Sequence, residues 1–374
     1  MNMLLKCRIQ NLAIIFSFLS GILLTLSVIK FEQKCDTHSE AYSHYSLRRI
    51  KPGVYDLIIL IISSPTNGDR RQVIRETWLQ FEDKLQYDAE INNFRMKYYF
   101  VIGSINLNAD TILHLSTEQS VNNDLLFLNL KDEYSALTSK VLNSLIWLNE
   151  QHSNKNFDYN FMLKCDDDTF VRIDILAKEI ISMRASLIKD KARSMDKIID
   201  ILEANSKELS AISKEQKQIT HLYWGYFNGD AKIKMQGKWK ETEWIYCDRY
   251  IPYALGGGYI LSSGLVTYIA KNANYLKLLK SEDVSVGLWL APVANIERQH
   301  DIRFDTEWTS RGCKNTHIIT HKHSIEDMRT LYKNIESTGN LCKEEFTRRP
   351  SYEYNWDVPP SQCCQRERNE NMKP

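Results

Sequence analysis

Three consecutive aspartates, Asp166, Asp167 and Asp168, have the clearest chemical meaning in this chain. Carboxylates packed this closely repel one another unless a cation or another counter-charge neutralises them. Oxygen ligands of this kind suit a hard divalent ion such as Mg²⁺ or Mn²⁺. The cluster follows the apolar run Tyr159–Leu163, and open α/β sheets bind ligands at the carboxyl ends of their strands. We therefore predict a metal site here, with a solvated acidic turn as the alternative.

Glu282 and Asp283 precede a stretch of apolar residues that ends at Leu290 and is typical of a helix. A carboxylate in such a place can act as a general base, which takes the proton from an attacking hydroxyl. Acids at the N-terminus of a helix are also common as caps or as partners of the helix dipole. Both interpretations stay open at this point.

His321 closes the run Thr316–Thr320, which we expect to be a strand, and can supply a nitrogen ligand to the same ion. His317 and His323 compete with it for this role. A single histidine is more often structural than metal-bound, so the pattern alone does not settle the choice.

A helix expected at Arg70–Gln80 begins just after the first apolar run and carries Arg71 and Arg75 four residues apart, on one face. The N-terminal amides of a helix favour anions, so these arginines could share the charge of a nucleotide diphosphate. A solvated helix surface would explain them equally well.

Aromatic residues gather between 223 and 263, around the run Gly256–Gly258. Aromatic rings can stack on the faces of sugars, and glycine lets the backbone approach a ligand closely. The residues assigned to sugar binding are Trp224, Gly257, Gly258 and Glu282. Core packing is the rival explanation for most of the rings.

These residues lie among alternating strand and helix patterns. The strands expected from apolar runs are Tyr55–Ser63, Met96–Ile102, Leu125–Leu130 and Tyr159–Leu163. The charged and apolar sides of Arg70–Gln80 and Ser135–Asn149 predict amphipathic helices between them. The alternation predicts an α/β domain with a mostly parallel sheet, interrupted by a charged helical insertion at about 184–219.

An N-terminal anchor is predicted from residues 9–29, which are 21 residues without a charge. A helix of this length spans about 30 Å, the thickness of the hydrocarbon core. We expect a cytoplasmic tail at 1–8, a signal anchor at 9–29, a stem at 30–53 and a catalytic domain at 54–374. A cleaved signal peptide is the alternative, although its apolar region is usually shorter.

Composition narrows the class of protein. The 374 residues carry a formal net charge of +1, so no nucleic-acid partner is indicated. Eight cysteines are present, and with Cys7 in the cytoplasmic tail an odd number, seven, remains on the far side. At least one of these is then free or paired between chains. No C-x-x-C pair occurs, which argues against a structural zinc site, and the pairing of the cysteines stays open.

The motifs taken together resemble the β-1,3-glycosyltransferase family that includes the β-1,3-galactosyltransferases and Fringe. The strings that carry this resemblance are Arg71–Trp78, Lys164–Val171, Tyr253–Ser262 and Glu282–Val284. Its linkage-region branch, which acts in proteoglycan synthesis, is similar in further strings: Arg303–Glu307, Ser310–Cys313, Thr320–Lys322 and Pro359–Arg366. The resemblance covers about residues 54–368. Many family members have Cys at the position of Ala254, whereas the members of the linkage-region branch resemble this chain at that position.

The resemblance implies a GT-A fold, a type II Golgi anchor and Mn²⁺-dependent, inverting transfer from UDP-galactose. The implied acceptor is the galactose of the galactosyl-xylosyl linker of proteoglycans. The implied residue roles are metal ligation by Asp168 and His321, contact with uridine and ribose by Asp166 and Asp167, donor binding by Arg71 and Arg75, and base catalysis by Asp283. Rival functions are a transferase of this family with another UDP-sugar or acceptor and a silent lectin-like or chaperone protein. A two-metal phosphoesterase is disfavoured, because the acids form one cluster.

Overall fold

The computed structural model describes residues 53–366, apart from 86, 90, 185–220 and 242–243. From Val54 onwards, the described residues belong to one compact unit. The predicted tail, the predicted anchor, nearly all of the predicted stem and residues 185–219 of the predicted insertion lie outside the described residues. Within the described part of the chain, no helix has the length and apolar character needed to cross a bilayer.

A seven-stranded sheet forms the centre of the fold, in the order β3-β2-β1-β4-β7-β6-β8. Its strands are β1 (Val54–Ile62), β2 (Met96–Ile105), β3 (Leu125–Lys131), β4 (Asp158–Asp166), β6 (His221–Asn228), β7 (Tyr253–Ser262) and β8 (Ile296–His300). Neighbours from β3 to β4 are parallel, β7 is antiparallel to β4 and β6, and β8 is parallel to β6. The predicted α/β class with a mostly parallel sheet is confirmed.

Both faces of the sheet are covered, and the sequence of β1 shows why. Its apolar residues alternate between two buried clusters, with Ile59 and Ile61 on one face and Ile58 and Leu60 on the other. A strand covered on both sides reads as a continuous apolar run, as residues 57–62 do.

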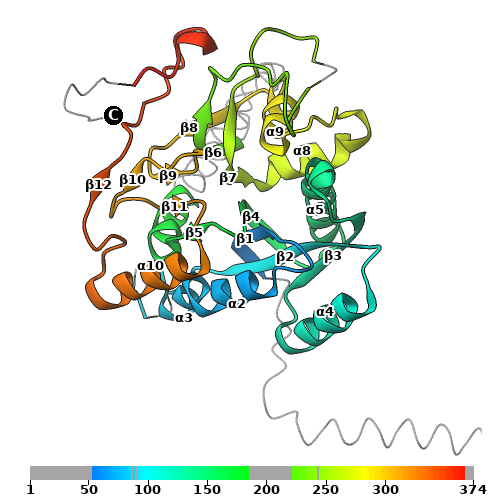
Figure 1. The fold of residues 1–374 in the computed structure, drawn as a ribbon, viewed down its shortest axis with the longest axis vertical. Coiled ribbons are helices and arrows are strands. Elements are labelled where there is room, and N and C mark those ends of the chain that lie inside the picture. The colour runs from blue at the N-terminus through cyan, green and yellow to red at the C-terminus, as the bar shows by residue number, and fades with distance from the viewer. Residues whose placement is uncertain (1–52, 86, 90, 185–220, 242–243, 367–374) are drawn as a thin grey trace, which may run out of the picture. The chain divides into compact units, whose positions relative to one another are not determined.

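The helices that cover the first face are α2 (Gly68–Glu76), α3 (Phe81–Leu85), α4 (Ala109–Asn122) and α10 (Ile325–Thr338). The second face is covered by α5 (Leu137–Ser153), α8 (Ser263–Asn272) and α9 (Glu282–Leu290). In Figure 1, α2, α3 and α10 lie together at the bottom of the view. Residues 173–184, on the first face, are also helical.

Two small sheets complete the fold. One holds β5 (Phe170–Val171), β11 (Ile319–Thr320) and β9 (Phe304–Asp305), in that order. The other pairs β10 (Gly312–Cys313) with β12 (Phe346–Thr347). A disulfide between Cys313 and Cys342 closes the segment that contains β11 and α10.

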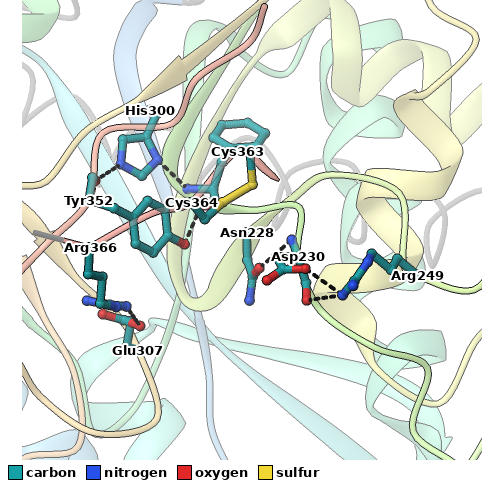
Figure 2. The surroundings of a disulfide bond; sticks show 10 residues. Asn228, Asp230, Arg249, His300, Glu307, Tyr352, Cys363, Cys364 and Arg366 are labelled. Atoms are coloured by element: carbon teal, nitrogen blue, oxygen red, sulfur yellow. Dashed lines mark hydrogen bonds and ion pairs between the residues drawn. A yellow bond between two sulfur atoms is a disulfide. The ribbon is translucent and has the colours of Figure 1, made fainter. Parts of the chain in front are cut away.

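The C-terminal segment is held against β6 and β8. The Tyr352 hydroxyl donates to the carbonyl of Phe227 at 2.8 Å, and a ring nitrogen of His300 lies 2.9 Å from the carbonyl of Tyr352. Figure 2 shows Tyr352 and His300 beside a second disulfide, which joins the neighbours Cys363 and Cys364. Among the described residues, Cys165 and Cys247 are unpaired.

Candidate active site

The register of the central sheet places the aspartate cluster beside the glycine run. Asp166 is the last residue of β4 and pairs with Ile62, the last residue of β1. On the other side of β4, Cys165 pairs with Gly258 of β7. The acids therefore leave the sheet at the carboxyl edge of two parallel strands, as their position in the sequence predicts.

The small sheet brings His321 to the same edge. Phe170, which follows the aspartates closely, pairs with Thr320 in β11. The next residue, His321, donates its backbone N–H to the carbonyl of Asp305 at 3.2 Å, and the N–H of His323 reaches the carbonyl of Asp168 at 2.9 Å. A histidine more than 150 residues away in sequence is thus fixed beside the acids by backbone hydrogen bonds.

Asp166, Asp168 and His321 form a group whose ligand atoms lie within 4.8 Å of one another. His321 Nε2 is 3.2 Å from Asp168 Oδ1 and 3.9 Å from Asp166 Oδ2. This set contains the two predicted metal ligands and adds Asp166. Two carboxylates and one imidazole can hold a divalent cation.

The charges of this group also fit a cation. Burial and the neighbouring carboxylate of Asp166 raise the pKa of Asp168 to about 6. Burial lowers the pKa of His321 to about 4, which leaves the imidazole neutral at pH 7 with a free lone pair. Asp168 Oδ1 is buried without a hydrogen-bond partner among the described residues. A bound cation would offset both the repulsion between the acids and this unmet acceptor.

Asp167 points away from the group. Its Oδ2 accepts hydrogen bonds from Ser63 Oγ and Asn67 Nδ2, both at 2.8 Å, and 9% of the residue is exposed. Asp167 does not line the cavity described below. The middle aspartate therefore ties the loop after β1 to the end of β4, and its predicted contact with the nucleotide stays a prediction.

The N-terminus of α9 forms the opposite side of the site through a buried lysine. Lys164, with 1% of its side chain exposed, donates to Asp166 Oδ1 at 2.8 Å and to Glu282 Oε1 at 2.5 Å. The Tyr259 hydroxyl donates to the other oxygen of Glu282 at 3.1 Å. Burial raises the pKa of Glu282 to about 7 against the opposing charge of Lys164. Glu282 is thus an internal partner of Lys164, and its carboxylate does not cap the helix.

Asp283 faces the cavity. Its Oδ2 accepts the backbone N–H of Gly256 at 3.0 Å, and its Oδ1 accepts that of Val284 at 2.8 Å. Burial raises the pKa of Asp283, against the effect of these N–H groups. A fixed carboxylate with a raised pKa suits a general base, since a higher pKa makes the carboxylate a stronger base. The bond to Val284 also shows that the alternative of a helix-end contact holds in part.

The glycine run keeps space open for these side chains. A Cβ on Gly257 would collide with the His321 ring, and one on Gly256 would lie 2.7 Å from Glu282 Oε1. A Cβ on Gly258 would lie 2.8 Å from the side chain of Ile319. Gly257 lines the cavity, whereas Gly258 packs beside β11. At these positions glycine allows close approach to the site's own side chains.

Arg71 and Arg75 lie away from the cavity lining. The Arg71 guanidinium is 1% exposed and pairs with Glu118 of α4 at 2.6 Å, while Arg75 pairs with Glu118 at 2.6 Å and Asp124 at 2.8 Å. Arg70, one residue earlier in α2, lines the cavity and donates to the carbonyl of His323 at 3.1 Å. The shared face of Arg71 and Arg75 is thus turned towards α4. Both guanidinium groups pair with acids there, so these ion pairs do not support the predicted contact with the donor nucleotide.

Trp224 lies in the core, not in the cavity lining. It is fully buried, its indole N–H donates to Asp301 at 3.0 Å, and its ring packs on Phe304. The aromatic side chains that line the cavity are Tyr134, Trp239, Tyr250, Tyr253 and Trp308. Core packing, the rival explanation for the aromatic residues, is the correct one for Trp224.

The metal group and Asp283 line one cavity of about 970 Å³. Acids line part of it, namely Asp166, Asp168, Glu282 and Asp283. Cations line another part, namely Arg70, Lys234, Lys238 and Lys322. Ligand pockets in proteins measure about 300–1,000 Å³, so this cavity is at the upper end of the range.

Sequence reasoning missed Lys164 and Trp308, and it chose Arg71 and Arg75 over Arg70 for the donor and Trp224 over Trp239 for the sugar. A signal for Lys164 existed, because the period of two in a strand puts residues 164 and 166 on one side of β4. Arg70 was seen as part of the helix start, but its direction was not deduced. Trp308 lies in a loop between β9 and β10, where no periodicity predicts the direction of a side chain.

Known sequences identify the family of this chain. The sequence profile described as Galactosyltransferase matches residues 69–301. The mouse protein named Beta-1,3-galactosyltransferase 6 is 37% identical over 349 residues, which are 93% of this chain and 94% of that protein.

More distant relatives share a part of their length with this chain. The zebrafish protein UDP-GalNAc:beta-1,3-N-acetylgalactosaminyltransferase 2 is 27% identical over 61% of this chain and 38% of its own length. The Arabidopsis thaliana protein Beta-1,3-galactosyltransferase GALT1 is 26% identical over 82% of this chain and 41% of its own length. The crystal structure of a glycosyltransferase involved in the glycosylation of the major capsid of PBCV-1 aligns with 74% of this chain and 98% of its own chain. The TM-score of this alignment is 0.31 and the sequence identity is 10%. On its profile match and its similarity to the mouse protein, the chain belongs to the galactosyltransferase family.

Proposed function

We propose that this chain is a galactosylxylosylprotein 3-β-galactosyltransferase of the galactosyltransferase II type. It transfers galactose from UDP-galactose to O3 of the galactose in the galactosyl-xylosyl linker of proteoglycans, a step of glycosaminoglycan linkage-region synthesis. The 37% identity to the mouse β-1,3-galactosyltransferase 6, over nearly the whole of both chains, supports the reaction type. The acceptor and the GT-A fold type follow from the motif resemblance.

The observation that carries the proposal is that one cavity holds both the metal group and the base. Asp166, Asp168 and His321 line it together with Asp283. An inverting transfer needs a cation at the leaving diphosphate and a carboxylate at the attacking hydroxyl, as two separate groups. The buried Lys164 connects them, because it binds both Asp166 and Glu282, the neighbour of Asp283.

The metal proposed for Asp166, Asp168 and His321 is Mn²⁺. When bound, a divalent cation of this kind stabilises the negative charge on the departing diphosphate. Arg70 and Lys322, which line the cavity near this group, add positive charge on the same side. His321 would offer Nε2, the ring nitrogen nearer Asp168, to the cation, and its backbone N–H bond to Asp305 fixes the position of the chain there.

Asp283 performs the proton transfer in the proposed reaction. One oxygen of Asp283 accepts the proton of the acceptor's O3 hydroxyl. At the same time, O3 of the acceptor forms a bond to the anomeric carbon of the donor galactose. The bond between this carbon and the β-phosphate oxygen breaks, and UDP leaves with the electron pair. The configuration inverts because attack and departure take place on opposite faces. The N–H groups of Gly256 and Val284 hold the carboxylate in position for this step.

We also propose that the enzyme is a type II protein of the Golgi membrane, with its catalytic domain in the lumen. The uncharged residues 9–29 support an anchor, although they lie outside the described residues. The two disulfides are compatible with the lumen of the secretory pathway, where such bonds persist.

A donor and acceptor matrix tests the proposal. The full-length chain in detergent would be assayed with UDP-galactose, UDP-N-acetylglucosamine and UDP-N-acetylgalactosamine, each with a galactosyl-xyloside and with Mn²⁺ or excess chelator. We expect Mn²⁺-dependent transfer of galactose in a β-1,3 linkage, read by mass spectrometry and NMR. Preference for another UDP-sugar would assign the rival function within the family. Undiminished transfer in chelator would contradict the metal site.

A further inference from the structure

Three aromatic side chains from separate segments meet in the cavity lining. The rings of Trp239 and Trp308 are 5.6 Å apart and nearly perpendicular, and the ring of Tyr134 lies 6.1 Å from that of Trp239. The Trp239 indole N–H donates to the Tyr134 hydroxyl. The Lys238 ammonium lies 4.3 Å from the ring centres of both Tyr134 and Trp239. We call Tyr134, Trp239, Trp308 and Lys238 the aromatic platform.

Core packing does not explain the aromatic platform. Trp308 is 69% exposed and Tyr134 is 44% exposed, although both line the cavity. Trp224, the tryptophan of the same site region that does pack in the core, is fully buried. Large rings that stay exposed in a concave site are available to a ligand with apolar faces.

The aromatic platform lines the same cavity as the metal group and the base. The Lys322 ammonium lies over the ring of Trp308, and Lys322 directly follows His321 in the chain. Tyr134 lines the cavity near both groups, because the carboxylates of Asp283, Asp166 and Glu282 add to the effect of burial in raising its pKa. A sugar bound to the platform would therefore be close to the acceptor hydroxyl, not remote from the reaction.

The chemistry of the platform fits a sugar ring. The C–H faces of a pyranose are apolar and match aromatic rings, whereas its hydroxyl edges need hydrogen-bond partners. The ammonium group of Lys238 can donate to such hydroxyls, and no carboxylate of the described residues pairs with it. The cavity is large enough for a second sugar besides the donor and the reacting sugar, since its volume is at the upper end of ligand pockets.

We propose that the aromatic platform binds the sugar next to the reacting galactose, so that the enzyme recognises its acceptor as a disaccharide. This inference rests on the proposed function and adds the residues that select the acceptor. The platform contacts the linker sugar on the reducing side of the reacting galactose. Trp308 and Trp239 stack on the faces of that sugar, and Lys238 donates to its hydroxyls.

The test compares two acceptors in the full-length enzyme. Values of kcat/KM are measured with Mn²⁺ and UDP-galactose for a simple galactoside and for a galactosyl-xyloside. In the wild type the disaccharide is preferred. In Trp308→Ala the ratio of the two kcat/KM values falls about tenfold, mostly through the KM of the disaccharide, because stacking of this kind is worth about one factor of ten. Trp308→Phe, which keeps a ring, restores part of the ratio.

The control is Tyr275→Ala. Tyr275 is 88% exposed and does not line the cavity, so its loss removes an exposed ring without touching the platform. We expect its ratio of kcat/KM values to equal that of the wild type. Thermal unfolding of each variant shows that the fold is kept.

Binding measurements separate failure of this inference from failure of the proposed function. Saturation-transfer NMR with UDP and Mn²⁺ reports binding of the disaccharide without any transfer. If the wild type transfers galactose but Trp308→Ala and the wild type have equal ratios, the platform is overturned and the proposed function stands. If the wild type binds the disaccharide without transferring galactose and Trp308→Ala loses that binding, the function fails and the platform stands. A wild type that does not bind the disaccharide overturns the platform.

Discussion

Two clusters of buried charges in this molecule have different balances. The first, which we call the α2–α4 cluster, pairs Arg71 and Arg75 with Glu118 and Asp124. The second, which we call the acid cluster, consists of Asp166, Asp168, Glu282 and Asp283, with Lys164 as their buried cation. The first cluster has as many cations as acids. The second has four acids, and Lys164 is the only lysine or arginine of the described residues that pairs with them. The other cations of the cavity lining, Arg70, Lys234, Lys238 and Lys322, do not bond to these acids.

The difference in balance separates structure from function. Although burial acts to raise it, hydrogen bonds from Arg71 and Arg75 lower the pKa of Glu118, so that carboxylate stays charged and paired. In the acid cluster burial raises the pKa of Asp168, Glu282 and Asp283. Carboxylates that are left without enough positive charge are available for a cation and a proton. A balanced cluster stabilises the fold, and an unbalanced one prepares a reaction.

The largest effect is expected for Asp283→Asn. Removing the base should lower kcat by about 10²–10⁴-fold, the usual contribution of general-base catalysis. The free energy of unfolding should change by less than about 1.5 kcal/mol, because the relief of repulsion among the acids offsets the loss of one of the two backbone N–H bonds that the carboxylate accepts. Steady-state kinetics and urea unfolding measure both quantities.

The control for this variant is Asp110→Asn, which removes an exposed acid from the first turn of α4. It should leave kcat unchanged. Near-normal turnover in a folded Asp283→Asn protein would show that another group is the base.

The second prediction concerns Arg71→Met in the α2–α4 cluster. Breaking this ion pair leaves Glu118 with Arg75 as its remaining partner and should lower the free energy of unfolding by about 1.5–3 kcal/mol, the usual contribution of a hydrogen bond to a charged group. The KM for UDP-galactose of the folded enzyme should not change. Lys84→Met, which removes an exposed partner of Glu336, should cost less than about 1 kcal/mol. A selective rise of the donor KM in Arg71→Met would instead support the donor role that the family resemblance implies.

The third prediction concerns Gly257→Ala. The new Cβ collides with the His321 ring and must displace it from Asp168. We expect the Mn²⁺ concentration for half-maximal activity to rise about 10–100-fold, as for other changes to the groups that orient a metal ligand. The matched control is Gly68→Ala, where the new Cβ would have only an ordinary contact at 3.7 Å. An unchanged metal requirement in Gly257→Ala would mean that His321 is not a ligand.

The smallest effect is expected from lowering the pH from 7 to 6 in the metal-free protein. Burial lowers the pKa of four histidines to about 4, below their usual value near 6.5; they are His300, His317, His321 and His323. As the pH falls through 6.5, these histidines take up protons in the unfolded chain but stay neutral in the folded one. The free energy of unfolding therefore falls. Asp168 and Glu282, with pKa values raised to about 6 and 7, take up protons in the folded state and oppose this loss. The net loss should be about 1 kcal/mol, measured by urea unfolding in chelator. A stability that rises towards pH 6 would contradict the neutral histidines.

The sequence predicted the parts of the site that depend on strand ends. The apolar run before Asp166 predicted the strand β4. Because ligands bind at the carboxyl ends of strands in open α/β sheets, the end of this strand also predicted the position of the acids. The family was predicted from motifs and is confirmed. Bounds of β1, β2 and β3 differ from the expected ranges by at most three residues.

Side-chain directions were predicted less well, for physical reasons. In a helix, one residue turns the direction by about 100°, so the choice of Arg71 over Arg70 depended on which face α4 covers. Successive residues after a strand alternate in a similar way, and Asp167 turns inwards to Ser63 and Asn67. Trp224 and Trp308 differ in burial because of long-range packing, which composition does not reveal.

The bond between Cys313 and Cys342 has a practical consequence for anyone who prepares this enzyme. It closes a loop with a sequence separation of 29 residues that includes His321. Closing a loop of that length is worth about 3–4 kcal/mol in the unfolded-chain entropy account. Thiol reductants in a purification buffer, or expression in a reducing cytosol, would remove this restraint from the segment that carries the imidazole. Enzyme handled in this way should require more metal well before its helices melt.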